Sequence, residues 1–448
     1  MRSGAPTPAS WGTSMSRRTS RTPARPSSGS LFSSAFKCVS CPRGPEPDLV
    51  SRRGLTRGRL LVLLVSTAAS VLAGWVFLRA YRPAPQTVDV IDTTAEIIEL
   101  LERRRLGADA SQPDRTDADW PPPLVREPLD EATAAIYFPG LRHGKRHRYD
   151  PVAYFLHHPN WTARMKWAEH PDGEFRLRTN AQGLHEDEDV PATAAGLRIL
   201  VAGDSHIAGV CNNVESFPNV LEQRLADDAE LGSVDVVNAA QGGYGPHNYL
   251  GTIERFGELA PDVFVMVVYG GNDFSSMMVL QRHFERRRPP RGPLRKLPVG
   301  KGVDGIVPQE LQQALFFHSN EEDIAIAVGT IAAITVEVRE RCRELGARLV
   351  CVYLPPPSRG QPAIFEAQAK ELMAGVEIGP ESLSASDFIA DRWLEWLELE
   401  GVAGVDLRPV FRRVEEPLYW DGDKHINVRA HALIAEAVDP IVRELLAR

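Results

Sequence analysis

The chain has 448 residues, of which 43% are hydrophobic and 25% charged, and it contains five cysteines. This composition is typical of a globular protein, and it excludes both a single small domain and a disulfide scaffold. The net charge of −8 is unevenly distributed, because residues 1–59 carry +9 and the remainder therefore carries −17. The basic stretch ends where an apolar run begins. This pattern indicates a segment that lies beside a membrane rather than one that binds nucleic acid.

The apolar run that follows is long enough to cross a membrane. Residues 60–78 contain no charged side chain and lie between Arg59 and Arg79. At about 1.5 Å per residue, a helix of this length spans about 28 Å, close to the hydrocarbon thickness of a bilayer. We therefore predict a transmembrane anchor over residues 60–79. The positive-inside rule then places the N-terminus in the cytoplasm and the rest of the chain outside it.

A cleaved signal peptide is the alternative to an anchor, because residues 71–73 fit a cleavage site. The apolar run continues past this point, which favours the anchor. Residues 1–59 are rich in Ser, Pro, Arg and Gly, so we predict a disordered cytoplasmic tail. A downstream start of translation would remove this tail.

Residues 80–195 are predicted to form a linker and a small accessory region. The linker is rich in Pro and Asp, and aromatic residues are scattered over residues 131–196. Four histidines lie near one another in this region, but no carboxylate or cysteine lies at ligand spacing from them, so we expect no metal ion; they are His143, His147, His157 and His158.

From residue 196 onward, strands and helices are predicted to alternate. Short apolar runs rich in Val and Ile occupy residues 197–202, 234–238, 263–269 and 348–354, with a weaker run at 402–407. Helical segments are predicted at 217–229, 321–345, 384–400 and 428–446. Strands that are apolar on both faces and separated by helices indicate an α/β fold with a parallel sheet between helical layers.

Polar residues follow the predicted strands at their carboxyl ends, where ligands bind in such sheets. Ser205 follows the first strand in the sequence Gly-Asp-Ser-His, Gly243 lies in a glycine-rich stretch after the second, and Asn272 follows the third. The block at residues 419–427, just before the last helix, contains His425 and two aspartates. A serine becomes a nucleophile at neutral pH when a base lies within hydrogen-bond reach and an acid orients that base.

These four blocks, in this order, resemble those of the SGNH (GDSL) hydrolase family over roughly residues 196–448. The resemblance implies a three-layer α/β/α, flavodoxin-like fold in which Ser205 is the nucleophile and His425 the general base. It implies an oxyanion hole made by the backbone N–H groups of Ser205 and Gly243 and by the side-chain amide of Asn272. It also implies that no metal or cofactor takes part.

The acid of the triad is less clearly marked. The family's usual acid lies three residues before the histidine, and that position is Gly422 here. Asp423 matches a variant of the family in which the acid lies two residues before the histidine, and Asp421 is the alternative. Residues 178–183 resemble a segment that often precedes the first block in membrane-anchored members.

Two further features carry weaker hypotheses. A basic, proline-containing insertion at residues 282–296 is a lid for an anionic substrate, a solvated loop, or a loop that rests on an anionic membrane surface. His206, next to the candidate nucleophile, is expected in core packing or at the surface rather than against the substrate.

The predicted function is ester hydrolysis outside the cytoplasmic membrane through an acyl-enzyme, on an acylated small molecule, glycan or lipid, with no nucleic-acid partner. An O-acyltransferase that modifies a cell-envelope polysaccharide is one alternative, because the same residues can pass the acyl group to a sugar hydroxyl when water is excluded. A catalytically silent SGNH-like binding module is the other alternative.

Overall fold

The structure is a computed structural model, and it describes residues 120–448 apart from 227, 229–230, 292–308, 375–377 and 448. The predicted cytoplasmic tail, the predicted transmembrane anchor and most of the predicted linker lie outside the described residues. Among the helices that are described, none combines the length and the apolar character that crossing a membrane requires.

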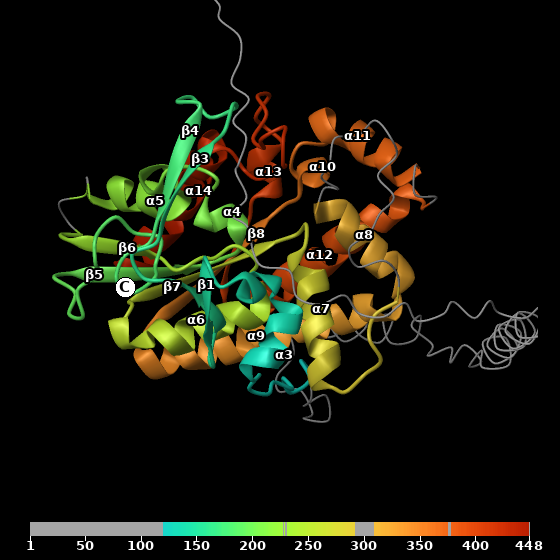
Figure 1. The fold of residues 1–448 in the computed structure, drawn as a ribbon, viewed down its shortest axis with the longest axis horizontal. Helices are drawn as coiled ribbons and strands as arrows, with labels where there is room; N and C mark the ends of the chain where they lie inside the picture. The colour runs from blue at the N-terminus through green and yellow to red at the C-terminus, as the bar shows by residue number, and fades with distance from the viewer. Residues whose placement is uncertain (1–119, 227, 229–230, 292–308, 375–377, 448) are drawn as a thin grey trace, which may run out of the picture. The chain divides into compact units, whose positions relative to one another are not determined.

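A sheet of five parallel strands forms the centre of the described chain (Figure 1). In spatial order the strands are β6 (Val234–Asn238), β5 (Leu197–Ala202), β7 (Val263–Tyr269), β8 (Arg348–Leu354) and β9 (Ala403–Asp406). Numbered along the chain, this order is 2-1-3-4-5, which is that of flavodoxin-like folds. The first four strands have the predicted bounds, and the fifth is slightly shorter than predicted.

Helices cover both faces of this sheet. Successive residues of each strand point to opposite sides, so each strand packs against both helical layers. In β5, Ile199 and Val201 pack with α5 (Phe217–Ala226) and α14 (Val428–Leu446) on one face. Leu200 and Ala202 pack on the other face (Figure 1), with α6 (Pro246–Phe256), α9 (Glu322–Leu345) and α12 (Ser384–Leu399). The observed fold is therefore the predicted three-layer arrangement.

The remaining helices lie mainly at the carboxyl edge of the sheet and in its connections. The α-helices are α4 (Ser205–Ala208), α7 (Asp273–Phe284), α8 (Gln309–Ser319), α10 (Pro357–Gly360), α11 (Pro362–Ala374) and α13 (Arg408–Phe411). Four 3₁₀ turns accompany them: η1 (Pro139–His143), η2 (Asn213–Glu215), η3 (Gly257–Leu259) and η4 (Pro380–Leu383). Helices α6, α7, α8 and α11 were not predicted from the sequence.

The described part of the accessory region consists of one α-helix, the 3₁₀ turn η1 and two antiparallel hairpins. Helix α3 (Glu131–Tyr137) is followed by β1 (His147–Asp150) paired with β2 (Tyr154–His157), and by β3 (Thr162–Lys166) paired with β4 (Glu174–Arg178). Phe155 and Leu156 of β2 belong to the same buried cluster as the sheet residue Leu200. The accessory region therefore shares a core with the sheet.

Candidate active site

Ser205 lies at the turn between strand β5 and the short helix α4. Asp204 precedes it in an extended conformation, and its side chain accepts the backbone N–H of His206 at 2.8 Å. This cap ends the strand and starts the helix within three residues. The serine is thereby placed beyond the carboxyl end of β5, beside the switch point of the sheet between β5 and β7, where ligands bind in open α/β folds.

His425 connects Ser205 to an aspartate through its two ring nitrogens. Nε2 lies 2.8 Å from Oγ of Ser205, and Nδ1 lies 2.8 Å from Oδ2 of Asp423. Asp423 also accepts the backbone N–H of His425 at 3.0 Å. In the neutral ring, donation from Nδ1 to the carboxylate leaves the lone pair of Nε2 free to accept the serine proton. This is the hydrogen-bond order that an activated serine requires.

The structure separates the two candidate acids. Asp421 has a side chain that is 90% exposed, and it pairs with Nζ of Lys424 at 2.6 Å. Lys424 has a φ of 62°, and its N–H bonds to the carbonyl of Trp420, so the chain turns between the two aspartates. This turn brings Asp423 to His425 and leaves Asp421 at the surface.

The glycine-rich stretch after β6 lies against the serine. Gly243 has a φ of +90°, a conformation that favours glycine. A Cβ built on the preceding residue, Gly242, would lie 3.7 Å from Cβ of Ser205. The backbone of this stretch can therefore approach a substrate carbonyl bound at Ser205.

Asn272 ends the connection from β7 and precedes helix α7. Burial raises the pKa of Asp204 to about 6, and interactions that include one with the side chain of Asn272 oppose this rise. The side-chain amide of Asn272 has two N–H groups that can donate to a substrate oxygen. The next residue, Asp273, is held in place by two hydrogen bonds. Its carboxyl accepts the hydroxyl of Tyr249 and the N–H of Tyr269, both at 2.7 Å.

His206 is buried and contacts the candidate base rather than an open surface. Its ring centroid lies 4.5 Å from that of His425 at an interplanar angle of 30°. Nδ1 of His206 accepts the N–H of Ile426, and Nε2 lies 3.0 Å from Oε1 of Gln309. Since one nitrogen accepts, the other must carry the proton of a neutral ring. Burial lowers the pKa of His206 well below its usual value, and His425 lowers it further.

Glu169, in the turn between β3 and β4, was not predicted as a site residue. Its carboxylate accepts the backbone N–H groups of Asp421 and Gly422, the latter at 2.8 Å. Two donors of the turn that carries Asp423 are therefore satisfied by the accessory region. The sequence gives no signal for this contact, because an acidic residue in an exposed turn is common and the two partners are about 250 positions apart.

The basic insertion is largely neutralised within the described residues. Arg282 is buried and bonds to Asp323 at 2.6 Å, and Arg287 bonds to the same carboxyl group at 3.0 Å. Arg286 and Arg291 form longer ion pairs with glutamates, at 3.4 Å each. These contacts favour a structural role for the described part of the insertion over a lid for anionic substrates. Arg295 and Lys296 lie outside the described residues.

The accessory histidines form an aromatic cluster. His157 lies between His147 and His185, with each pair of ring centroids 4.7 Å apart. The pKa of His147 is lowered to about 4 and that of His185 to about 3, in both cases mainly because the ring is buried. Within the described part of the chain, no group of three or more His, Cys, Asp or Glu side chains could hold a metal ion.

Comparisons with known proteins bear on this site. Residues 201–433, more than half of the chain, match the model of the GDSL-like Lipase/Acylhydrolase family. No curated protein matches the chain. Among solved structures, the psychrotrophic esterase EstA from Pseudoalteromonas sp. is 12% identical; the match covers 56% of this chain and 99% of EstA, with a TM-score of 0.34. Axe2, an acetyl-xylooligosaccharide esterase from Geobacillus Stearmophilus, is 13% identical over 56% of this chain and 95% of its own, with a TM-score of 0.35.

The family match includes the blocks that contain Ser205, Gly243, Asn272 and His425. The predicted SGNH resemblance is thus confirmed at the level of the family, whereas membrane anchoring is untested by these comparisons. The chain belongs to the GDSL-like lipase/acylhydrolase (SGNH hydrolase) family and is an ester hydrolase of that type.

Proposed function

We propose that this chain is a membrane-anchored serine esterase, in which Ser205 takes the acyl group of a carboxylic ester and water then releases it. The observation that carries the proposal is the chain of contacts Ser205–His425–Asp423, with 2.8 Å at each link. A hydroxyl, an imidazole and a carboxylate in this order are what covalent acyl transfer needs.

The first half of the reaction forms the acyl-enzyme. His425 Nε2 takes the proton of Ser205 as Oγ bonds to the carbonyl carbon, and Asp423 stabilises the resulting imidazolium through Nδ1–H. The carbonyl oxygen becomes an oxyanion, which the N–H groups of Ser205 and Gly243 and the side-chain amide of Asn272 bind. The ester bond then breaks, and His425 gives its proton to the departing alkoxide.

The second half repeats these steps with water in place of the alcohol. His425 takes a proton from water, the hydroxide adds to the acyl carbon, and the carboxylic acid leaves as the proton returns to Oγ of Ser205. The net reaction consumes one ester and one water and yields one acid and one alcohol. The steps described here use only these side chains, backbone N–H groups and water.

The full-length chain, purified in detergent, provides the test of this function. It should hydrolyse p-nitrophenyl esters and react with a fluorophosphonate probe, and the Ser205→Ala and His425→Ala variants should lose both activities. Labelling that survives Ser205→Ala would contradict the proposed nucleophile. Hydrolysis that survives both substitutions would contradict the proposed mechanism.

The proposed location is outside the cytoplasmic membrane, on a single N-terminal helix. The support is the uncharged run at residues 60–78 and the excess of arginine before it. In right-side-out membrane vesicles, external protease should digest the catalytic part of the chain, and in inverted vesicles it should spare it. Release of the chain by alkaline carbonate, or protection in right-side-out vesicles, would contradict an anchored external enzyme.

A further inference from the structure

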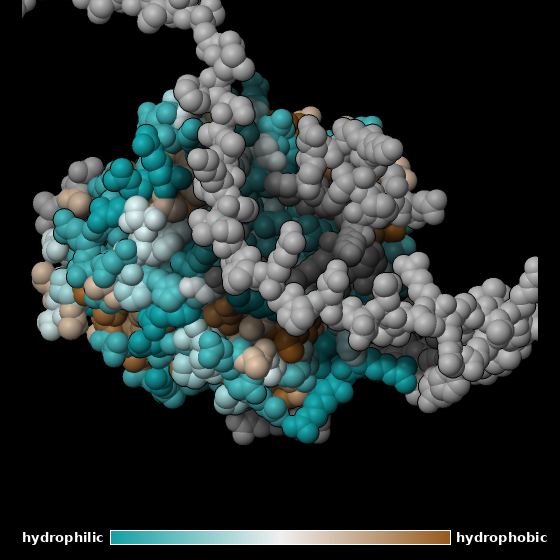
Figure 2. Space-filling view, in the orientation of Figure 1, coloured by the Kyte–Doolittle hydropathy of each residue, from teal (hydrophilic) through white to brown (hydrophobic). Residues whose placement is uncertain are grey.

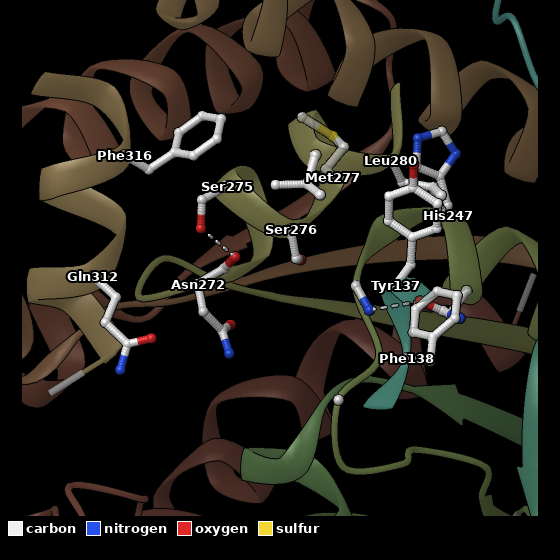
Figure 3. A pocket seen from close by; sticks show the side chains of 14 residues that line it. Tyr137, Phe138, His247, Asn272, Ser275, Ser276, Met277, Leu280, Gln312 and Phe316 are labelled. Carbon is white, nitrogen blue, oxygen red and sulfur yellow. Dashed lines mark hydrogen bonds between the residues drawn. The ribbon is translucent and has the colours of Figure 1, made fainter. Parts of the chain in front are cut away.

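A cavity opens at one side of the candidate oxyanion hole. It has a volume of about 240 Å³, and Gly243 and Asn272 lie in its wall. Figure 3 shows Phe316 and Gln312 of α8 on one side and Tyr137 and Phe138 of the accessory region on the other. Residues of α7 complete the lining, among them Met277, Val279 and Leu280. In Figure 2, apolar side chains gather near α3 and α7, the helices beside this cavity.

The lining of the cavity fits an uncharged, apolar group. None of the residues that the structure describes in the lining is Lys, Arg, Asp or Glu. Ser275 and Ser276 donate their hydroxyls to backbone carbonyls of the same helix turn, at 2.9 and 3.0 Å. Asn248 uses both ends of its amide on backbone groups, at 2.9 and 3.0 Å. His247 is buried, and burial lowers its pKa to about 3, so it is neutral.

The position of the cavity indicates which half of a bound ester, acyl or alcohol, it would contain. The departing alkoxide takes its proton from Nε2 of His425, so the alcohol half of the substrate must lie on the His425 side. The cavity lies on the other side, because it is lined by the oxyanion residues Gly243 and Asn272 and by no residue of the block at 419–427. It is therefore placed to receive the acyl half.

The size of the cavity sets the length of the acyl group. A volume of about 240 Å³ is many times the ~10–15 Å³ that a cavity needs on this measure to hold one water molecule. The space therefore suits an acyl chain of several methylene groups rather than an acetyl group alone. An acetyl group would leave most of this apolar surface uncovered.

We infer that the enzyme prefers esters of medium-length, unbranched acyl chains, and that the accessory region sets this preference through Tyr137 and Phe138. This inference rests on the proposed function, since it concerns the acyl group carried by Ser205. Phe138 packs against Phe155 of β2 with ring centroids 5.1 Å apart, and Phe155 lies 3.8 Å from the position of a Cβ built on Gly243. Residues upstream of 201–433, the part that matches the family model, thus form a wall of the proposed acyl pocket.

The test compares kcat/KM of the full-length chain for p-nitrophenyl acetate, butyrate, hexanoate, octanoate and dodecanoate. Burial of each methylene should raise kcat/KM by up to about fourfold, so hexanoate or octanoate should exceed acetate by about tenfold or more, and dodecanoate should fall again. A preference for acetate over the longer esters would overturn the inference.

Two substitutions test the wall of the pocket. Val279→Trp adds bulk from a half-buried position on α7 and should lower the octanoate-to-acetate ratio about tenfold or more. Tyr137→Ala removes bulk from the accessory wall and should move the maximum towards dodecanoate. Ile136→Trp is the matched control, because Ile136 is 59% exposed and does not line the cavity, so its ratio should equal that of the wild type.

The outcomes separate this inference from the proposed function. If the wild type hydrolyses esters and Val279→Trp and Tyr137→Ala leave the chain-length profile unchanged, the acyl pocket is elsewhere and the esterase assignment stands. If no ester is hydrolysed and no fluorophosphonate labels Ser205, both proposals fail. Far-UV circular dichroism and thermal unfolding of each variant serve as the check that it has folded.

Discussion

The carboxyl edge of the central sheet and the accessory region contribute to the site in different ways. The sheet edge and the block before α14 provide all the proposed reacting groups: Ser205, His425 and Asp423. The accessory region provides none of them, but it contacts the site on two sides. Glu169 holds the turn that carries Asp423, and Tyr137 and Phe138 line the cavity beside Asn272. The reacting groups thus belong to the part of the chain with the family fold. The accessory region, which precedes it, helps to position the acid and contributes to the proposed specificity.

The largest expected effect concerns a proposed reacting group at the sheet edge. Asp423→Asn should lower kcat by about 10³- to 10⁴-fold, because the amide no longer stabilises the imidazolium of His425 or holds its tautomer. Asp421→Asn is the matched control and should change kcat less than about twofold, since its side chain is exposed and pairs with Lys424 in a surface ion pair. Steady-state kinetics with one ester distinguish them. The reverse ranking would assign the acid to Asp421.

An intermediate effect is expected where the sheet edge supports its own base. His206→Leu removes the ring stacked on His425 and the acceptor for the N–H of Ile426. Because His206 positions His425 without touching the substrate, kcat should fall about tenfold with little change in KM. His206→Asn retains a side-chain acceptor and should recover part of this loss. A change confined to KM would indicate a substrate contact instead.

A smaller effect is expected from the support that the accessory region gives to the acid. Glu169→Ala leaves the backbone N–H groups of Asp421 and Gly422 without their partner, so the turn becomes less ordered and kcat should fall about fivefold. Glu174→Ala, in strand β4 of the same hairpin, removes only an exposed ion pair with Arg164 and is the control. Equal kcat values for the two variants would show that the hairpin does not position Asp423.

The smallest effect on catalysis at neutral pH is expected in the core of the accessory region. A substitution there should instead change how the free energy of unfolding depends on pH. His185 has a pKa of about 3 in the folded chain, mainly because of its burial, and about 6.5 when unfolded. Between these values the unfolded chain binds a proton that the folded chain does not, so the free energy of unfolding decreases as the pH falls below about 6.5. His185→Phe should remove about 1.4 kcal/mol per pH unit of this dependence between about pH 4 and 6. Denaturant unfolding at several pH values measures the slope, and an unchanged slope would contradict a neutral buried ring.

The sheet could be predicted because strands buried on both faces leave continuous apolar runs in the sequence. The bounds of β5, β6, β7 and β8 follow from these runs alone. The block at Ser205 could be located because it follows a predicted strand, at the edge where ligands bind. His425 could be located because its block resembles that of the SGNH family.

Features that depend on tertiary contacts could not be predicted. The choice between Asp421 and Asp423 depends on a turn in which Lys424 has a positive φ, and residue spacing does not encode this. The role of Glu169 depends on a contact between residues far apart in the chain. Helix α7 begins within the third block, and no helix was predicted there from the sequence.

The proposal that Ser205 carries the acyl group can be tested by mass spectrometry of the acyl-enzyme. The full-length chain is mixed with excess p-nitrophenyl octanoate, quenched in acid within milliseconds to seconds, and digested for peptide mapping. The peptide that contains Ser205 should gain the mass of one octanoyl group, and the corresponding peptide of Ser205→Ala should not. An octanoyl group on another residue, or turnover of the ester by Ser205→Ala at the wild-type rate, would contradict this assignment.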